Sequence, residues 1–433
     1  MSAPYSIVTY SHENLRGILG QASKVDDTTL NEKLHLVYFK EYFAALKTST
    51  IVIEEDYVDR DFLEDYAGYY VRCFTKYRRK CRRLHFFSVP FTCDDFEAFL
   101  AGHSSQIDEY ILNHAYLGFV VVKPLPQTIV GRTCLKTYGD DGGRRHYSST
   151  QLVTAHLFGT RLQIKTLPFQ EQDSVVAACA TSALWTVFHG SGYFLQHTIP
   201  SPVEITRKAT SLLPLETRLL PSRGLTPAQM AYAIRGVRLE PFLVDAVNLS
   251  ALKGAMYAYL RGGISLILGI DLVDTSFSTG NSIQGKYIGR HAVAITGFSL
   301  GKRDLKSTNF VNSGIEGLLK AARIDKIYVH DDQVGPFARM VFDDVEVTFQ
   351  SNGKSYSRES LSTSWRGNDG IIGSMRAMTD ILLIPLYHKI RIPFGVIHDH
   401  VHCLDTFIEI LRQEQKLEVN SRIEWDIYLT TVN

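Results

Sequence analysis

Residues 289–298 read GRHAVAITGF, a run in which His291 precedes a string of apolar and β-branched residues. Such a run predicts a short buried strand that begins at His291. We expect further strands at 264–270 and 326–330, and the two acids Asp331 and Asp332 directly follow the second of them. If the strands that hold the histidine and the acids pair, an acid can orient the imidazole.

A second stretch, QDSVVAACATSALW at 172–185, predicts a helix that begins at Cys179 and ends at Gly190. A thiol at a helix N-terminus lies beside unpaired N–H groups, which favour the thiolate. We expect Cys179 as nucleophile, His291 as base and an aspartate as orienter. Asp331, the first acid after its strand, is preferred, and Asp332 stays an alternative. The Cys179 N–H and the Gln172 amide are candidate oxyanion donors.

Helices are expected between these two stretches and strands after them. SPVE at 201–204 and TPAQ at 226–229 are capping boxes with proline in the first turn. A further helix at 252–260 is closed by two glycines, and strand-like runs follow at 264–270, 292–298, 326–330 and 339–342. Helices followed by strands indicate an α+β fold.

The stretch from about 165 to 345 resembles the papain-like cysteine peptidases and looks closest to their bacterial C39-like branch. The resemblance rests on Gln172 followed by CATSAL, on GLTPAQM at 224–230, on GGISLILGI at 262–270 and on HAVAITG. It implies a helical half that carries the cysteine and an antiparallel β half that carries the histidine and the aspartate. It also implies the roles of nucleophile for Cys179, base for His291, orienter for Asp331 and oxyanion donor for Gln172.

The activity implied is that of a thiol hydrolase, which cleaves a peptide or isopeptide bond of a protein or peptide substrate without a metal or cofactor. Transfer of the acyl group to an amine is a variant of the same chemistry. The sequence departs from the family in three places. Gln172 precedes Cys179 by seven residues rather than six, Ala180 replaces a glycine or tryptophan, and the acid lies in HDDQVGPF rather than in an Asn-Ser-Trp-Gly motif.

The loop YGDDGGRRHYSST at 138–150 suggests a domain boundary. We expect an N-terminal α/β region at 1–145, a papain-like catalytic domain at 150–350 and a C-terminal extension at 351–433. Helices at 34–46 and 62–77 and strands at 51–54 and 116–123 are expected in the first region. The extension is expected to contain a polar loop, a strand, a helix and a last strand, at 351–364, 380–387, 401–413 and 425–432, and to pack on the first region.

Composition excludes several classes of protein. The chain has 433 residues, is 45% hydrophobic and carries a formal net charge of +1, which excludes wholesale disorder and disfavours a protein that coats nucleic acid. No run approaches the ~20 apolar residues of a membrane span, and no secretory signal is recognised. Six scattered cysteines do not form a disulfide scaffold. We expect a protein of the reducing cytoplasm with no membrane contact.

Two other motifs carry rival interpretations. KYRRKCRR at 76–83 holds six basic residues in eight, which suggests either a nucleic-acid patch or, preferred here, a solvated helix face balanced by nearby acids. The cluster of His398, Asp399, His400 and His402 suggests either zinc or, preferred here, a structural role in which Asp399 caps a helix. The alternative functions are therefore a catalytically inert papain-like scaffold that binds protein, and a nucleic-acid-binding protein. The N-terminal region is a candidate for recruiting a partner.

Overall fold

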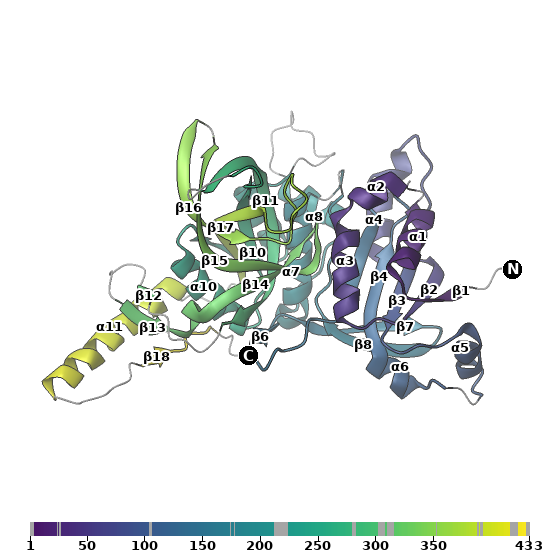
Figure 1. The fold of residues 1–433 in the computed structure, drawn as a ribbon, viewed down its shortest axis with the longest axis horizontal. Helices are drawn as coiled ribbons and strands as arrows, with labels where there is room; N and C mark the ends of the chain where they lie inside the picture. The colour runs from purple at the N-terminus through teal and green to yellow at the C-terminus, as the bar shows by residue number, and fades with distance from the viewer. Residues whose placement is uncertain are drawn as a thin grey trace.

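The computed structural model describes residues 4–429 except 24, 26, 104–105, 174, 177, 212–223, 279–282, 302–307, 310–315, 352, 388, 390–392 and 416–422. The fold is mixed α+β, as expected, with two large sheets of mainly antiparallel strands (Figure 1). No described helix is both long enough and apolar enough to cross a membrane.

The first sheet is antiparallel and follows chain order. Alternate residues of its strands point to opposite faces, so Ile51 and Ile53 join one hydrophobic cluster and Val52 another. Helices α1 and α3 cover the first face, while α4, α5, α6 and the β7–β8 hairpin cover the second. The strands are β1 (Tyr5–Thr9), β2 (Thr50–Tyr57), β3 (Cys81–Phe87), β4 (Tyr116–Val122) and β5 (Val130–Leu135).

The elements around this sheet are α1 (His12–Ser23), α2 (Asp27–Glu32), α3 (Leu34–Ala45), α4 (Arg60–Gly68), α5 (Cys93–Leu100), α6 (Glu109–Ala115), β7 (Gln151–Leu157) and β8 (Thr160–Thr166). The helix expected at 62–77 is shorter than predicted. It ends at Gly68, where a Cβ atom would lie 2.9 Å from Val203, and a single 3-10 turn follows at Tyr70–Arg72.

The second sheet closes on itself. Its strands run in the order β10, β11, β14, β15, β16 and β17, and β17 pairs again with β10 as well as with β9. The strands are β9 (Leu239–Asp245), β10 (Leu266–Asp274), β11 (Ile283–Leu300), β14 (Ile324–Asp331), β15 (Gly335–Ser351), β16 (Lys354–Ser362) and β17 (Met375–Tyr387), and the short β6 (Arg145–His146) adds to β11.

Helices α7 (Cys179–Leu195), α8 (Pro202–Ala209) and α9 (Pro227–Gly236) form one cluster against this sheet, and α10 (Leu249–Arg261) packs elsewhere on it. Both expected capping boxes are present. Helix α7 continues beyond the predicted end at Gly190. That glycine is needed inside the helix because a Cβ atom there would lie 2.4 Å from the Ser265 hydroxyl.

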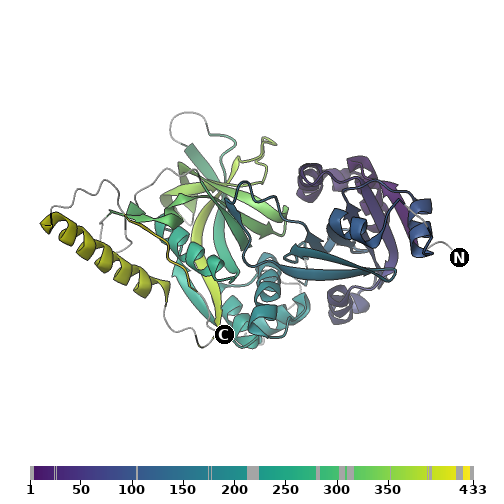
Figure 2. The same cartoon turned by 90° about the horizontal axis from the view of Figure 1, so that it is seen from below.

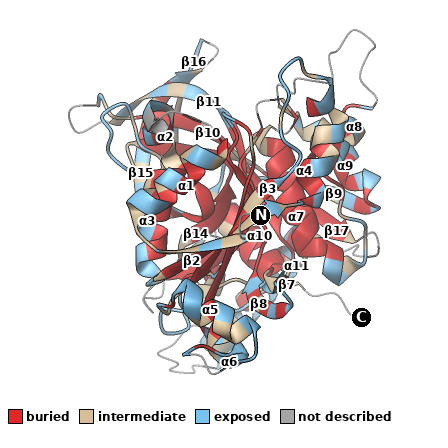
Figure 3. Ribbon diagram, turned by 90° about the vertical axis from the view of Figure 1, so that its right-hand side faces the viewer, coloured by how far each residue is buried: buried red, intermediate tan, exposed pale blue. Residues whose placement is uncertain are grey.

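Buried residues of α3 and of the closed sheet belong to one hydrophobic cluster, which includes Phe39, Phe43, Val329 and Phe337. Figure 3 colours the buried stretches of both red. The domain boundary expected at 138–150 therefore lies between two regions that share one hydrophobic core. The loop itself contains β6, whose residues pair with Phe298 and Ser299.

The C-terminal extension is arranged differently from the expectation. Its strands β16 and β17 are part of the closed sheet rather than a layer on the first region. The stretch 351–364, expected as a loop because it is polar, contains β16, whose polar side chains alternate outward along β15. Helix α11 (Phe394–Glu414) then extends away from the body (Figures 1 and 2).

Short strands β12 (Thr308–Asn309), β13 (Glu316–Leu319) and β18 (Glu424–Trp425) pair beside α11, followed along the chain from β13 by a 3-10 turn at Lys320–Arg323. The last strand was expected at 425–432, but its described part is strand only at Trp425, and residues 430–432 lie outside the described residues.

Candidate active site

Helix α7 begins at Cys179, the residue that the sequence predicts as nucleophile. The residue before it, Ala178, has an extended backbone and no side chain that can cap the helix. The first N–H groups of a buried, 17-residue helix are therefore directed toward the region of the Cys179 thiol without a side-chain acceptor. Cys179 is only partly buried, so its sulfur is at the edge of the core.

His291 lies within β11 rather than at its start. Residues 283–290 alternate between half-buried and exposed, and the fully buried half of the strand begins at His291. Its Nε2 atom is 3.0 Å from Oδ1 of Asp331. Nδ1 is the ring nitrogen that Asp331 does not occupy, and the Cys179 side chain is among the neighbours that raise the pKa of His291.

The charge of this imidazole follows from its neighbours. Burial alone lowers the pKa of His291, but the carboxylates of Asp331 and Asp332 and the hydrogen bonds to Asp331 and Cys179 outweigh it. The pKa of His291 is therefore raised well above its ordinary value. An imidazolium beside a thiol stabilises the thiolate.

Asp331 is the last residue of β14 and faces His291 because β14 pairs antiparallel with β11, with Ala294 opposite His330. Trp365 donates its indole N–H to Oδ2 at 2.6 Å, and the backbone N–H of Gln333 donates to Oδ1 at 3.2 Å. Burial raises the pKa of Asp331, but the charge of His291 and these hydrogen bonds reverse the effect and lower it. Asp331 is thus held as a carboxylate in contact with the ring.

Trp365 is a site residue that the sequence interpretation missed. Its ring stands edge-on to His291, with centroids 5.5 Å apart, so it covers the imidazole as well as bonding the acid. The available signal was a single tryptophan in the polar stretch SLSTSWRGND. A large side chain with one donor in such a stretch needs a buried acceptor.

Asp332 is buried but contacts the His291 ring less closely than Asp331 does. Its nearer oxygen lies 3.7 Å from Nε2 of His291, and both of its carboxyl oxygens lack a hydrogen-bond partner among the described residues. Burial, together with the charge of Asp331, outweighs the opposing charge of His291 and raises the pKa of Asp332 to about 7. The ionised form is therefore disfavoured at this position.

Gln172 precedes α7 in an irregular segment and is half-buried. Its side chain makes no hydrogen bond within the described part of the chain. The residues around it are anchored to the first region: Glu171 accepts from the Ile129 and Val130 amides and pairs with Lys33, and Tyr70 bonds Asp173.

A second glutamine, Gln170, was not singled out in the sequence. It is 3% exposed and its side-chain nitrogen lacks a partner among the described groups. It is therefore the other amide in this segment that could act as an oxyanion donor.

The groups His291, Asp331 and Asp332 have ligand atoms within 4.8 Å of one another, a spacing that could hold a cation. Nε2 of His291 and Oδ1 of Asp331, two of the atoms that would bind a metal, already share a hydrogen bond. A metal ion would have to replace the proton between them. This arrangement fits a proton better than a resident ion.

The histidine cluster of α11 does not gather on one face. Because α11 begins at Phe394, residues 398–402 lie inside the helix, so His398 and His402 share a face while His400 points in a different direction. His398 is buried while His400 is exposed. Asp399 is therefore not the residue that caps this helix.

The basic run at 76–83 is not a helix face. It enters β3 at Cys81, and its charges pair with acids of β2: Lys80 with Asp56, Arg82 with Glu55, and Arg83 with Glu54. Half of the six basic residues are thus balanced across adjacent strands, although the sequence interpretation placed the run on a helix.

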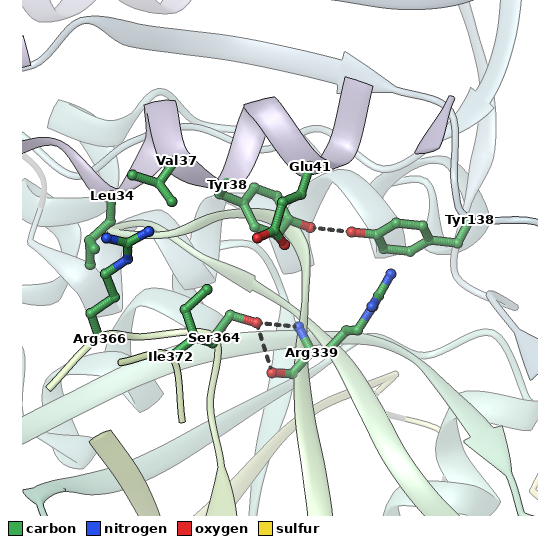
Figure 4. A pocket seen from close by; sticks show the side chains of 9 residues that line it. All are labelled: Leu34, Val37, Tyr38, Glu41, Tyr138, Arg339, Ser364, Arg366 and Ile372. Carbon is green, nitrogen blue, oxygen red and sulfur yellow. Dashed lines mark hydrogen bonds between the residues drawn. The ribbon is translucent and has the colours of Figure 1, made fainter. Parts of the chain in front are cut away.

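A cavity of about 60 Å³ lies between α3 and β15, next to Trp365 along the chain. In Figure 4, the hydroxyls of Tyr38 and Tyr138 bond to each other in the upper part of the view. The Ser364 hydroxyl bonds to the Arg339 backbone in the lower part. Ser364, the residue before Trp365, is therefore held to β15 by two hydrogen bonds between its hydroxyl and the Arg339 backbone.

No protein-family model matches this chain, and no curated protein matches it with significance.

Proposed function

We propose that this protein is a thiol hydrolase with a Cys179–His291–Asp331 triad and that it acts on a peptide or isopeptide bond. The observation that supports the proposal is the bond between Nε2 of His291 and Oδ1 of Asp331, on a ring whose pKa is also raised by Cys179, the first residue of α7. Each element of thiol catalysis, a nucleophile, a base and an orienter, then has one residue.

In the proposed reaction the Cys179 thiolate attacks the substrate carbonyl carbon and forms a carbon–sulfur bond. The carbonyl oxygen becomes an oxyanion, which the Cys179 N–H and a glutamine amide would stabilise. His291 gives its proton to the leaving amine as the carbon–nitrogen bond breaks, which leaves a thioester. Water then loses a proton to His291, attacks the thioester and releases the acid and the thiolate. An amine in place of water would give acyl transfer.

Alkylation with iodoacetamide tests the proposal without a known substrate. Cys93 and Cys403 are exposed thiols in the same chain and serve as internal references. We expect Cys179 to be modified at pH 6 at least tenfold faster than either reference, and His291→Ala to remove this advantage. Mass spectrometry identifies each modified site, and Cys179→Ala confirms the assignment.

Equal rates at the three thiols would contradict the proposal and favour an inert binding scaffold. The nucleic-acid alternative is weakened by the ion pairs of Lys80, Arg82 and Arg83 with the acids of β2. It would require steeply salt-dependent binding that depends on the remaining basic residues of the run.

A further inference from the structure

Helix α11 contacts the rest of the protein through a few residues of one face, and its opposite face is apolar. Phe394 and His398 are buried on the inner face, and Asp405 accepts a hydrogen bond from the Trp425 indole at 2.7 Å. The helix lies at the end of the molecule farthest from the N-terminus in both views (Figures 1 and 2). Twenty-one residues make it about 30 Å long.

The outward face carries six apolar residues within an arc of about 120° on a helical projection. All six are exposed, and 57% of the surface of Phe407 is accessible. The residues of this outer stripe are Val396, Cys403, Leu404, Phe407, Ile410 and Leu411. An apolar stripe of this width on a solvent-facing helix marks a contact surface.

We propose that the outer stripe pairs with the same stripe of a second copy of this chain, in antiparallel orientation about Phe407. In this register Leu404 faces Ile410 of the second copy and Cys403 faces Leu411. His400 then faces Glu414, so a potential cation meets an acid at each end. A parallel pairing would instead place Glu414 against its own copy and Asp399 against its own copy.

The size and charge of the stripe support this occupant. Two such helices would bury on the order of 1,000 Å² in total, near the lower limit for a specific interface, so we expect a micromolar dimer. A lipid surface fits less well, because membrane-bound amphipathic helices are rich in lysine and arginine. The basic residues of α11, apart from its histidines, are limited to Arg412 near its C-terminal end.

Sedimentation velocity of the full chain between 1 and 200 µM tests self-association. We expect the mass to double with concentration and Phe407→Glu to keep the protein monomeric throughout. Phe74→Glu is the control, since Phe74 is an even more exposed aromatic residue far along the chain from α11, and it should dimerise like the wild type. Circular dichroism checks that both variants are folded.

Cross-linking tests the orientation. In a Cys93→Ser background, Leu411→Cys should give an oxidised dimer through the native Cys403 of the other copy, and adding Cys403→Ser should abolish it. A monomer at every concentration would overturn the proposal, as would a disulfide between the two Cys403 residues. Monomers that sediment with phosphatidylcholine–phosphatidylserine vesicles would replace it with membrane binding.

Discussion

Nε2 of His35 lies 3.0 Å from the carbonyl oxygen of Asp332, although 297 residues separate the two in the chain. His35 belongs to α3, which otherwise covers the first sheet. Tyr38, one turn later, donates to the Pro336 carbonyl at 2.6 Å, and its ring packs where a Cβ atom of Gly335 would be 2.4 Å away. The N-terminal region thus holds the turn that follows Asp331, the acid of the proposed triad.

His35→Ala should therefore impair the site as well as the fold. It leaves the buried Asp332 carbonyl without its partner, at a cost of about 1–3 kcal/mol in the free energy of unfolding. We expect Cys179 alkylation to slow about three- to tenfold. Lys40→Ala, an exposed change on the same helix, should alter neither quantity. A stable His35→Ala variant with an unchanged alkylation rate would separate α3 from the triad.

The two acids should behave differently when each is replaced by its amide. Asp331→Asn removes the charge that orients His291, so turnover of a thiol-hydrolase probe such as p-nitrophenyl acetate should fall by about 10²–10⁴-fold. Asp332→Asn should stay within threefold of the wild type. If the larger loss belongs to Asp332→Asn, the roles of the two acids are reversed.

Asp332→Asn should also stabilise the protein at alkaline pH. The pKa of Asp332 is raised by burial and by Asp331 to about 7, so the folded state resists ionisation that the unfolded chain accepts near pH 4. This residue therefore costs stability increasingly as the pH rises between those two values. The melting temperature of the variant should exceed that of the wild type at pH 8, and the difference should disappear near pH 4.

The contribution of His291 to stability should depend on pH in the opposite way. Despite burial, its pKa is raised by Asp331 and Asp332, so the folded state holds the proton more tightly than the unfolded state. Its contribution to stability is complete below about pH 6.5 and is lost as the pH rises through the higher folded-state pKa. The difference in melting temperature between wild type and His291→Gln should shrink from pH 6 toward pH 10. A constant difference would argue against an imidazolium.

Gln172 and Gln170 can be distinguished by two reagents. Gln172→Ala should slow acylation by p-nitrophenyl acetate about 10²-fold, because that step develops an oxyanion. It should leave alkylation by iodoacetamide unchanged, since displacement at a saturated carbon develops none. Gln170→Ala is the matched comparison. If Gln170→Ala, and not Gln172→Ala, reacts slowly with the ester, the buried side-chain amide of Gln170 is the oxyanion donor.

Local signals predicted much of the second region. The start of α7 at Cys179 and both capping boxes depend on neighbouring residues, and each is present in the structure. Strand β11 was expected to begin at His291, but it begins at Ile283. Gly285 lies inside this strand at a position where a Cβ atom would be 2.1 Å from the Val273 side chain, so the close packing there requires a glycine.

Contacts between distant segments could not be predicted in this way. Trp365 reaches Asp331 through a loop of the extension, and His35 reaches Asp332 from another sheet. Neither contact leaves a periodic pattern in the chain. The polar strand β16 was missed for a related reason, since its pairing with β15 rather than its composition makes it a strand.

The closed sheet has a consequence for synthesis of the chain on the ribosome. A nascent chain already holds the thiol and the imidazole when residue 291 has been made. It still lacks Trp365, which bonds Asp331, and β17, which joins β16 to β10. The nucleophile is therefore translated long before the parts that complete its site. The site in which the proposed triad lies is therefore complete only after these last segments have been made.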